Sequence, residues 1–322
     1  MRSLKYFLAA LAFVAVPAPA QHAASYPNKA IRIIVPFTPG SATDIVARLV
    51  GEKLNAAWGE PVIVENRPGA GGTIGIAQTA KADPDGYTLA VVSTGHVVNH
   101  VLYKDLPYDT LKDLAGVAPL ASLPSVLVVS SALGIRSVKE LVAAAKARPG
   151  ELNYGTAGVG SAAHINSEKF NVAAGIQAVH VPLKGTPPIL TETMGGRVHF
   201  AWVPSVSSIG PLKDGKLVAL AVSTPARIAA LPEVPTIAEA GFPGGEFNFW
   251  VGLLAPAKTP RDIVARLNAQ INRALHSPEM VERLAKLGGE PMSMNAPQFD
   301  AFMRQEYQVL GKLMRDAGAK PQ

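Results

Sequence analysis

The stretch IRIIVPFTPGSATD, residues 31–44, joins a run of apolar β-branched residues to an amphipathic segment. The apolar run predicts a buried strand, and the spacing of valines and leucines after it predicts a helix over Thr43–Trp58. Between them, Pro36–Asp44 contains a proline–glycine bend followed by hydroxyl and carboxylate residues typical of helix N-caps and first turns. Because a helix N-terminus offers free N–H groups and a positive dipole end, this turn is predicted to bind an anion.

Strand and helix signals continue to alternate after this stretch. Further strands are predicted at Val62–Val64 and Thr88–Ser93, which gives a βαβαβ pattern and hence a parallel sheet. A second copy of the pattern begins near Ser125. Beyond Thr224 the chain is mostly helical with one predicted strand, Trp250–Ala255, which cannot form a sheet alone.

The simplest arrangement adds the single C-terminal strand to the first sheet. We therefore expect two open α/β sheets in two lobes, joined by a two-strand hinge. Lobe 1 would comprise residues 21–122 and 225–322, and residues 123–224 would form lobe 2 as an insertion. Such lobes bind ligands in the crevice at the carboxyl ends of their strands and close over them.

The amino-acid composition excludes several classes of function. The chain has 322 residues, of which 48% are hydrophobic, and it has no cysteine, so disulfides, thiolate metal sites and cysteine nucleophiles are excluded. Its formal net charge is +6, and the basic residues are scattered rather than clustered. This scatter argues against nucleic-acid binding.

Residues 1–20 have the features of a secretory signal peptide. Arg2 and Lys5 precede the apolar run Leu8–Val16, and small residues follow at Ala18–Ala20. The apolar run is shorter than the roughly 20 residues that span a bilayer, which argues against a membrane anchor. We therefore expect export and cleavage, which would lower the net charge to +4 because two basic and no acidic residues are removed.

The second predicted lobe contains a counterpart of the first turn. The segment Thr156–Ser161 again follows a strand and precedes a helix, and His164 lies one turn inside that helix. Two helix N-termini that face each other across a cleft would hold an anion from both sides. The alternative is that each turn is only a capped strand–helix connection, with Thr43 and Ser161 as the caps. The presence of two such turns, one in each predicted lobe, favours anion binding over simple helix capping.

Other chemistries lack their motifs. The sequence has no G-x-x-x-x-G-K-[ST] loop, no G-x-S-x-G elbow and no H-E-x-x-H motif, and neither turn contains Lys or Arg. This favours a carboxylate held by neutral donors and water. His96 and His100 are four residues apart but have no acidic neighbour, so we expect no metal, and His96 is expected to line the cleft. Of the two strand tryptophans, Trp202 and Trp250, Trp202 is the better candidate to line the ligand site, because it precedes Pro204 at a strand end.

Several segments resemble the Bug family, the extracytoplasmic solute receptors of tripartite tricarboxylate transporters. The matching segments are spread in order along essentially the whole mature chain: Val35–Asp44, Val64–Gly72, Asp85–Leu89, Asn153–His164, Val181–Gly185 and Leu231–Gly241. The resemblance implies a type II-like periplasmic binding protein that has no catalytic activity or cofactor and grips a carboxylate between the two turns. The chain departs from the family at Ser41, where a second glycine is common, and at Leu310, where an aromatic residue is common.

The sequence thus predicts a monomeric periplasmic receptor for a di- or tricarboxylate, an acidic amino acid or an aromatic acid, which it would deliver to membrane permease subunits. One alternative is a sensory receptor that docks on a membrane sensor kinase, and another is an exported hydrolase or isomerase that uses Asp44 or His164. The candidate ligand-binding residues are Phe37, Thr38, Gly40, Ser41, Ala42, Thr43, Asp44, His96, Thr156, Gly158, Gly160, Ser161, His164, Trp202 and Pro204.

Overall fold

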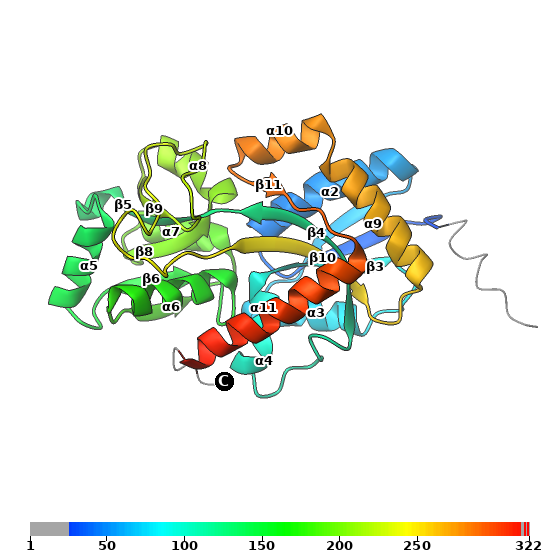
Figure 1. Cartoon of the computed structure of the whole chain (residues 1–322), viewed down its shortest axis with the longest axis horizontal. Coiled ribbons are helices and arrows are strands. Elements are labelled where there is room, and N and C mark those ends of the chain that lie inside the picture. Colours follow the sequence, from blue (N-terminus) through cyan, green and yellow to red (C-terminus); the bar gives the residue numbers. More distant parts are fainter. Residues whose placement is uncertain (1–25, 317–318, 320, 322) are drawn as a thin grey trace, which may run out of the picture.

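The computed structural model describes residues 26–316, 319 and 321, so the expected signal peptide lies outside the described residues. Two mixed β-sheets with helices on their faces form two lobes that lie side by side (Figure 1). This agrees with the predicted α/β class. In the part of the chain that is described, no helix is long and apolar enough to cross a membrane.

The first sheet has six strands, which in spatial order are β11 (Glu290–Pro291), β4 (Leu114–Leu123), β10 (Phe249–Pro256), β3 (Thr88–Ser93), β1 (Ile31–Val35) and β2 (Val62–Asn66). As predicted, β1 is parallel to β2 and β3. The later strand β10 is instead antiparallel to both β3 and β4, so the complete sheet is mixed. The C-terminal strand therefore does return to the first sheet.

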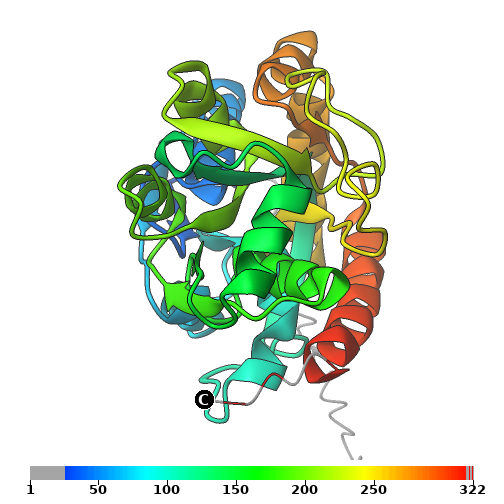
Figure 2. The ribbon, with the colours of Figure 1, turned by 90° about the vertical axis from the view of Figure 1, so that its left-hand side faces the viewer.

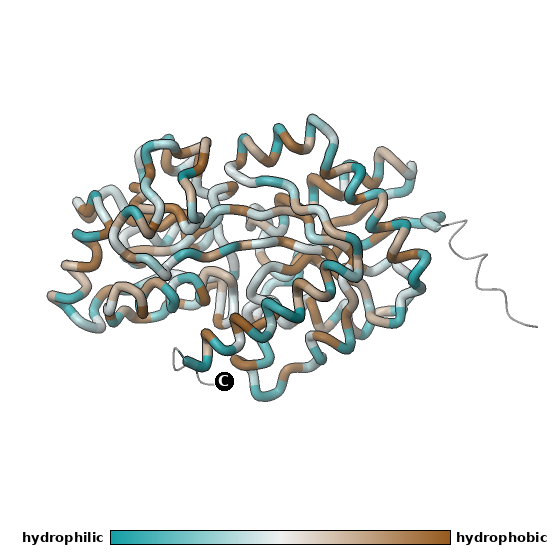
Figure 3. Tube along the Cα trace, viewed as in Figure 1, coloured by the Kyte–Doolittle hydropathy of each residue, from teal (hydrophilic) through white to brown (hydrophobic). Residues whose placement is uncertain are grey.

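Helices cover both sides of this sheet (Figure 1). The helices of this lobe are α2 (Ala42–Trp58), α3 (Thr73–Ala80), α4 (Asn99–Leu102), α9 (Arg261–Leu275), α10 (Pro278–Lys286) and α11 (Ala296–Asp316), with 3₁₀ turns at Ala70–Gly72 and Thr94–Val98. Every residue of β10 is buried, as expected for a central strand between two helical layers. Polar residues recur along the outer helices, and α11 runs from the first lobe toward the second (Figure 3).

The second sheet has five strands, in the order β7 (Val179–Pro182), β6 (Asn153–Thr156), β8 (Phe200–Pro204), β5 (Ser125–Ser130) and β9 (Leu217–Val222). Its helices are α5 (Val138–Ala147), α6 (Ala162–Ala174), α7 (Thr186–Met194) and α8 (Ser205–Lys213), with a 3₁₀ turn at Ser131–Leu133. Figure 2 views the molecule from the side of this lobe. Strands β6, β7 and β8 are parallel, whereas β5 is antiparallel to β8 and β9.

The period of two along a strand builds two apolar layers in the second lobe. In β8, Phe200 and Trp202 pack on the side that also holds Phe170 of α6. Their neighbours Ala201 and Val203 pack on the other side. Both faces of the sheet are therefore buried, which fixes the register of the strand.

Two chain crossings connect the lobes. Strand β4 continues into β5 through Pro124, and β9 leads to β10 through residues 223–248. Ser223 ties the crossings together, because its hydroxyl accepts from the Ser125 N–H at 3.1 Å and donates to the Phe247 carbonyl at 2.9 Å. Within the second crossing, Ile237 packs in the apolar layer of the second sheet, whereas Phe247 packs in the core of the first.

Candidate ligand-binding site between the lobes

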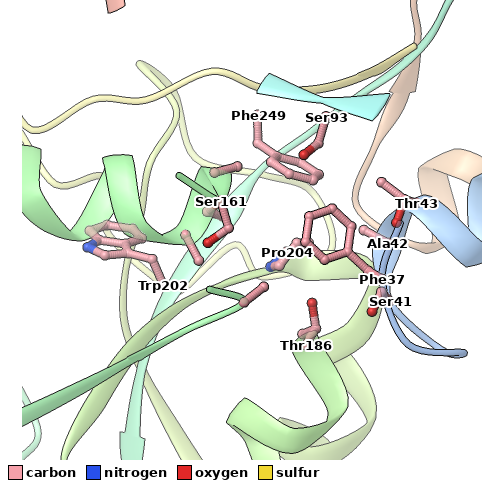
Figure 4. Close-up of a pocket in the computed structure, with 14 residues that line it drawn as sticks. Phe37, Ser41, Ala42, Thr43, Ser93, Ser161, Thr186, Trp202, Pro204 and Phe249 are labelled. Atoms are coloured by element: carbon pink, nitrogen blue, oxygen red, sulfur yellow. The ribbon is translucent and has the colours of Figure 1, made fainter. Parts of the chain in front are cut away.

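A small cavity of about 30 Å³ lies between the two sheets, which is room for one or two water molecules. Its lining residues are Phe37, Ser41, Ala42, Thr43, Ser93, Ser125, Ala157, Ser161, Ala162, Ala163, Thr186, Trp202, Pro204 and Phe249. Figure 4 shows the rings of Phe37 and Phe249 pointing into the space between the lobes. Among the described residues that line the cavity, hydroxyl and apolar side chains are present and charged ones are not.

The hydroxyls of the first-lobe turn do not cap helix α2. Ser41 occupies the N-cap position of α2, but its side chain makes no capping hydrogen bond. Its Oγ atom lies 3.4 Å from Oγ1 of Thr38. Thr43 is 2% exposed, and its Oγ1 has no hydrogen-bond partner among the described residues. A buried hydroxyl without a partner is costly, so this one is suited to a ligand atom.

Asp44 has a structural role beside the cavity. Its carboxylate accepts hydrogen bonds from the Gly40 N–H at 2.9 Å, from the Arg48 guanidinium at 3.1 Å and from the Asn66 amide at 2.9 Å. Burial acts to raise the pKa of Asp44, but these hydrogen bonds outweigh it and the pKa is lowered. The carboxylate is therefore ionised and satisfied within the first lobe.

The second-lobe turn is held by its own side chains. The Ser161 hydroxyl caps α6 by accepting from the His164 N–H at 3.3 Å. His164 Nδ1 accepts from the Gly160 N–H at 3.2 Å, and the His164 ring stacks on His180 with the ring centroids 4.4 Å apart. Burial, reinforced by His180, lowers the pKa of His164 to about 3, so the ring is neutral. The Thr156 hydroxyl is engaged with His180 Nε2 at 2.6 Å.

Four helices begin at this cavity. The N-cap residues Ser41 of α2, Ser161 of α6 and Pro204 of α8 line it, as does Thr186, the first residue of α7. Helices α2 and α6 begin with N–H groups that have no intrahelical partner, and these carry a partial positive charge. Helix α7 instead has Pro187 and Pro188, which lack an N–H, and the Ser205 N–H of α8 donates to the Pro124 carbonyl at 2.8 Å. The N-termini of α2 and α6 therefore give a region of positive potential that no lining cation supplies.

The structure brings seven of the predicted residues to the cavity: Phe37, Ser41, Ala42, Thr43, Ser161, Trp202 and Pro204. The other predicted residues do not line it: Thr38, Gly40, Asp44, His96, Thr156, Gly158, Gly160 and His164. The lining residues Ser93, Ser125, Ala163, Thr186 and Phe249 were not predicted, whereas Ala157 and Ala162 belong to the predicted second-lobe turn and the helix start that follows it. Ser93 ends a strand of the first βαβαβ unit, and Thr186 follows Gly185 at the start of a helix. Both positions could have been predicted from the sequence, because ligands bind at the carboxyl ends of strands in such sheets.

Two predicted residues lie mainly in the apolar cores. The His96 ring stacks on Tyr108 with centroids 5.9 Å apart, and burial lowers the pKa of His96 to about 4. The indole of Trp202 is fully buried and packs edge-on against Phe170, at 6.0 Å between centroids. Figure 4 shows this indole directed away from Thr43. Within the described part of the chain, no cluster of His, Asp and Glu could hold a metal.

Direct contacts between the lobes surround the cavity. The Thr38 N–H donates to the Lys184 carbonyl at 3.3 Å, and the Ser207 hydroxyl donates to the Gly40 carbonyl at 3.3 Å. On another side, the Tyr103 hydroxyl donates to the Val159 carbonyl at 2.9 Å. The lobes therefore touch through backbone groups of the two predicted turns, which explains the small volume of the cavity.

Comparison with known proteins agrees with this architecture. A family model described as "Tripartite tricarboxylate transporter family receptor" matches residues 46–319. Protein BugT of Bordetella pertussis is 37% identical over 313 residues, which cover 97% of this chain and 95% of BugT. The solved structure of the periplasmic binding protein BugD superposes with a TM-score of 0.88 at 31% identity, covering 92% of this chain and 100% of that chain.

A further solved structure, of an R. palustris protein with adipate, superposes with a TM-score of 0.89 at 34% identity, and covers 92% of this chain and 100% of that chain. These similarities confirm the predicted periplasmic binding protein fold, and with it the resemblance to the Bug receptors. The chain therefore belongs to the family of tripartite tricarboxylate transporter receptors.

Proposed function

We propose that this solute-binding receptor captures a small carboxylate between its lobes and delivers it to the membrane permease subunits of a tripartite tricarboxylate transporter. The observation that supports the proposal most directly is that helices α2 and α6, one from each lobe, begin at one cavity whose described lining has no charged side chain. Such a site attracts an anion through N–H groups and hydroxyls. The neighbour solved with adipate takes a ligand of this chemistry.

Within the site, we propose that Ser41, Thr43 and Ser161 hydrogen-bond a carboxylate, and that Phe37 and Phe249 pack against the body of the ligand. Ser41 and Thr43 have hydroxyls that the first lobe does not use for helix capping. The remaining candidate residues support the two turns rather than contact the ligand; His164, for example, holds the Gly160 N–H. Because the cavity has room for only one or two water molecules, binding of a larger ligand requires the lobes to separate and close again.

The lobes that move are proposed to be divided at the two crossings. The first boundary lies at Pro124, and the second falls within residues 237–247, because Ile237 packs with the second sheet and Phe247 with the first. This second boundary lies later in the chain than residue 224, where the sequence analysis ended lobe 2. Ser125, Ser223 and Phe247 would then form the hydrogen-bonded hinge.

We also propose that the ligand leaves chemically unchanged. No lining residue among those described is an acid or a general base, and the His164 ring nitrogen nearest the turn is engaged with the Gly160 N–H. Incubation of the protein with its ligand, followed by NMR of the solution, should return the same compound. A new product that disappears in a His164→Asn variant would refute a purely receptor role.

A thermal-shift screen against di- and tricarboxylates, aromatic acids and acidic amino acids tests the binding function. A ligand present at about 100 times its Kd should raise the free energy of unfolding by about 2.7 kcal/mol. No shift with any small anion would contradict the proposal. Isothermal titration calorimetry should then confirm one site per chain, and light scattering should show the monomer that we propose.

Export and delivery need separate measurements. Mass spectrometry of the periplasmic fraction should find a mature chain that begins near Gln21. Deleting the permease genes should abolish uptake of the bound carboxylate by cells that still make the receptor. Uptake that persists without the permease would argue against delivery to a tripartite transporter.

A further inference from the structure

A stack of three aromatic rings lies beside the second-lobe turn, Thr156–Ser161. The ring of His180, on the edge strand β7, stacks on Tyr154 of β6 with the centroids 5.1 Å apart, and on His164 of α6 at 4.4 Å. Tyr154 is almost completely buried, and its hydroxyl donates to the Glu168 carboxylate. The planes of the stacked rings differ by only 14° and 15°, so the His180 ring has a defined orientation.

Hydrogen bonds join this stack to the second-lobe turn at two places. His180 Nε2 lies 2.6 Å from Thr156 Oγ1, and the same oxygen accepts from the Gly158 N–H at 3.2 Å. His164 Nδ1 accepts from the Gly160 N–H at 3.2 Å. Gly158 and Gly160 have φ +109° and +78°, although glycine populates negative φ about as readily. The bonds from the stack therefore select one conformation of the turn.

The turn that is held in this way forms part of the contact between the lobes. The Val159 carbonyl accepts from the Tyr103 hydroxyl of the first lobe at 2.9 Å. A β-carbon on Gly158 would lie 3.0 Å from the backbone nitrogen of Gly71 in the first lobe. Ala157, next to Gly158, lines the cavity. A change in the turn would therefore alter the contact between the lobes and the cavity wall together.

His180 can affect these contacts only through its neighbours. It does not line the cavity, and its ring contacts and its side-chain hydrogen bond all involve second-lobe residues. Burial lowers the pKa of His180 to about 4, so the ring is neutral at pH 7. A neutral imidazole has one donor and one acceptor nitrogen, so its Nε2 and the Thr156 hydroxyl can share one proton in a single hydrogen bond.

We infer that His180 is a positioning residue for ligand capture, which fixes the second-lobe turn in the conformation against which the first lobe closes. The inference rests on the proposed receptor function and adds to it a residue outside the cavity. The feature that carries it is the chain of contacts from His180 through Thr156 to Gly158, and through His164 to Gly160.

Hydrogen exchange of the unliganded protein, followed by NMR, tests the effect on the turn. His180→Phe keeps a ring that can stack but has no Nε2, whereas His180→Gln keeps a polar group at similar reach. In the Phe variant the Gly158 amide should exchange at least about fivefold faster, because Thr156 loses the bond that orients it. The Gln variant should stay within about twofold of the natural protein.

The control for this measurement is His276→Phe, which replaces an exposed histidine of the first lobe and should leave the turn unchanged. Amides of the buried strand β10 report on the whole protein and should not respond to any of the three substitutions. An unchanged Gly158 amide in His180→Phe would overturn the inference. So would faster exchange in β10 to the same extent, because it would show a general loss of stability.

Calorimetry with succinate, adipate and citrate as probes tests the effect on capture. The probe that binds most tightly to the natural protein should bind His180→Phe at least about fivefold more weakly, because binding must then order the turn. His180→Gln should bind it within about twofold of the natural affinity. Unchanged affinity in the Phe variant would overturn the inference and leave the receptor function standing. If no anion of the thermal-shift screen binds the natural protein, the receptor function fails, and the role of His180 in capture fails with it.

A double-mutant cycle separates positioning from a purely structural role. Thr156→Val removes the oxygen that lies between His180 and Gly158 and keeps a side chain of similar shape. In that background, His180→Phe should weaken probe binding by less than about a further twofold, because both substitutions remove the same bond. Additive losses of affinity would contradict the inference. A lower free energy of unfolding with normal affinity would assign His180 to the stability of the second lobe alone.

Discussion

The carbonyl oxygen of Val159, in the second lobe, occupies the space where Gly71 of the first lobe would carry a β-carbon. Gly71 also has φ +60°, in the region that glycine adopts most easily. The Tyr103 hydroxyl donates to the same Val159 carbonyl at 2.9 Å. Contact between the lobes at this point therefore depends on the absence of a side chain at residue 71.

Replacing Gly71 with alanine should hold the lobes apart. We expect Gly71→Ala to weaken ligand binding at least about tenfold, because the added methyl group collides with backbone that cannot move aside. The control is Gly134→Ala, since Gly134 also has positive φ, +72°, but no neighbouring atom within 4 Å of an added β-carbon. Both variants should lose about 1 kcal/mol of stability. Calorimetry and small-angle scattering measure these effects, and equal affinities would contradict a closing role for Gly71.

Alanine substitutions of Ser41 and Ser161 should affect ligand affinity and protein stability differently. The Ser161 hydroxyl caps α6, so Ser161→Ala should lower the free energy of unfolding by about 1 kcal/mol. The Ser41 hydroxyl makes no cap, so Ser41→Ala should leave stability nearly unchanged and reduce ligand affinity. Urea denaturation and calorimetry on both variants provide the comparison. A destabilised Ser41→Ala protein with normal affinity would reverse the assignment.

The two fully buried tryptophans should respond differently to the same substitution. Trp250 Nε1 donates to the Glu306 carboxylate at 3.2 Å, whereas Trp202 Nε1 has no partner among the described residues. Burial raises the pKa of Glu306, and the single hydrogen bond from Trp250 and the charge of Lys169 oppose that rise. Trp250→Phe should therefore cost about 1–3 kcal/mol more than Trp202→Phe. Equal losses in denaturant unfolding would show that the indole–carboxylate bond contributes little.

Acidification should destabilise the second lobe through His164. Burial lowers the pKa of this histidine from 6.5 to about 3, so below pH 6.5 the unfolded chain binds a proton that the folded chain excludes. Stability should therefore fall as the pH drops from 6.5 toward 3, and the contribution of His164 at pH 5 should be about 2 kcal/mol.

His164→Asn provides the control for this pH dependence. The Asn carbonyl can still accept from the Gly160 N–H, but it does not titrate. The variant should lose about 2 kcal/mol less than the natural protein between pH 7 and pH 5. Identical pH profiles in urea unfolding would show that His164 does not titrate as its burial implies.

Local elements of the fold were well predicted because their signals are local. The helix expected over Thr43–Trp58 is α2, Ala42–Trp58, and the one expected over residues 162–173 is α6, Ala162–Ala174. Apolar periodicity and flanking glycine set both helices. The prediction missed α8, Ser205–Lys213, which contains Pro211, a residue that normally argues against a helix interior.

The pairing of distant strands was only partly predictable. Parallel pairing of β1, β2 and β3 followed from the βαβαβ pattern. The sequence analysis predicted no strand at Leu114–Leu123, and this segment is the ten-residue strand β4 that pairs with β10. Its partner lies more than a hundred residues away, and no local signal encodes such a pairing.

By itself, the sequence determined the two strand–turn–helix units and the absence of cationic and catalytic motifs around them. A turn's donors and hydroxyls are set by short-range geometry, so Ser41, Thr43 and Ser161 were identifiable as candidates. Only the tertiary structure decided which neighbours face the cavity. It turned His164 toward His180, placed Trp202 in the core, and brought Thr186 and Phe249 to the same space. The physical reason is that side-chain direction depends on packing between elements far apart in the chain, which local residue patterns do not contain.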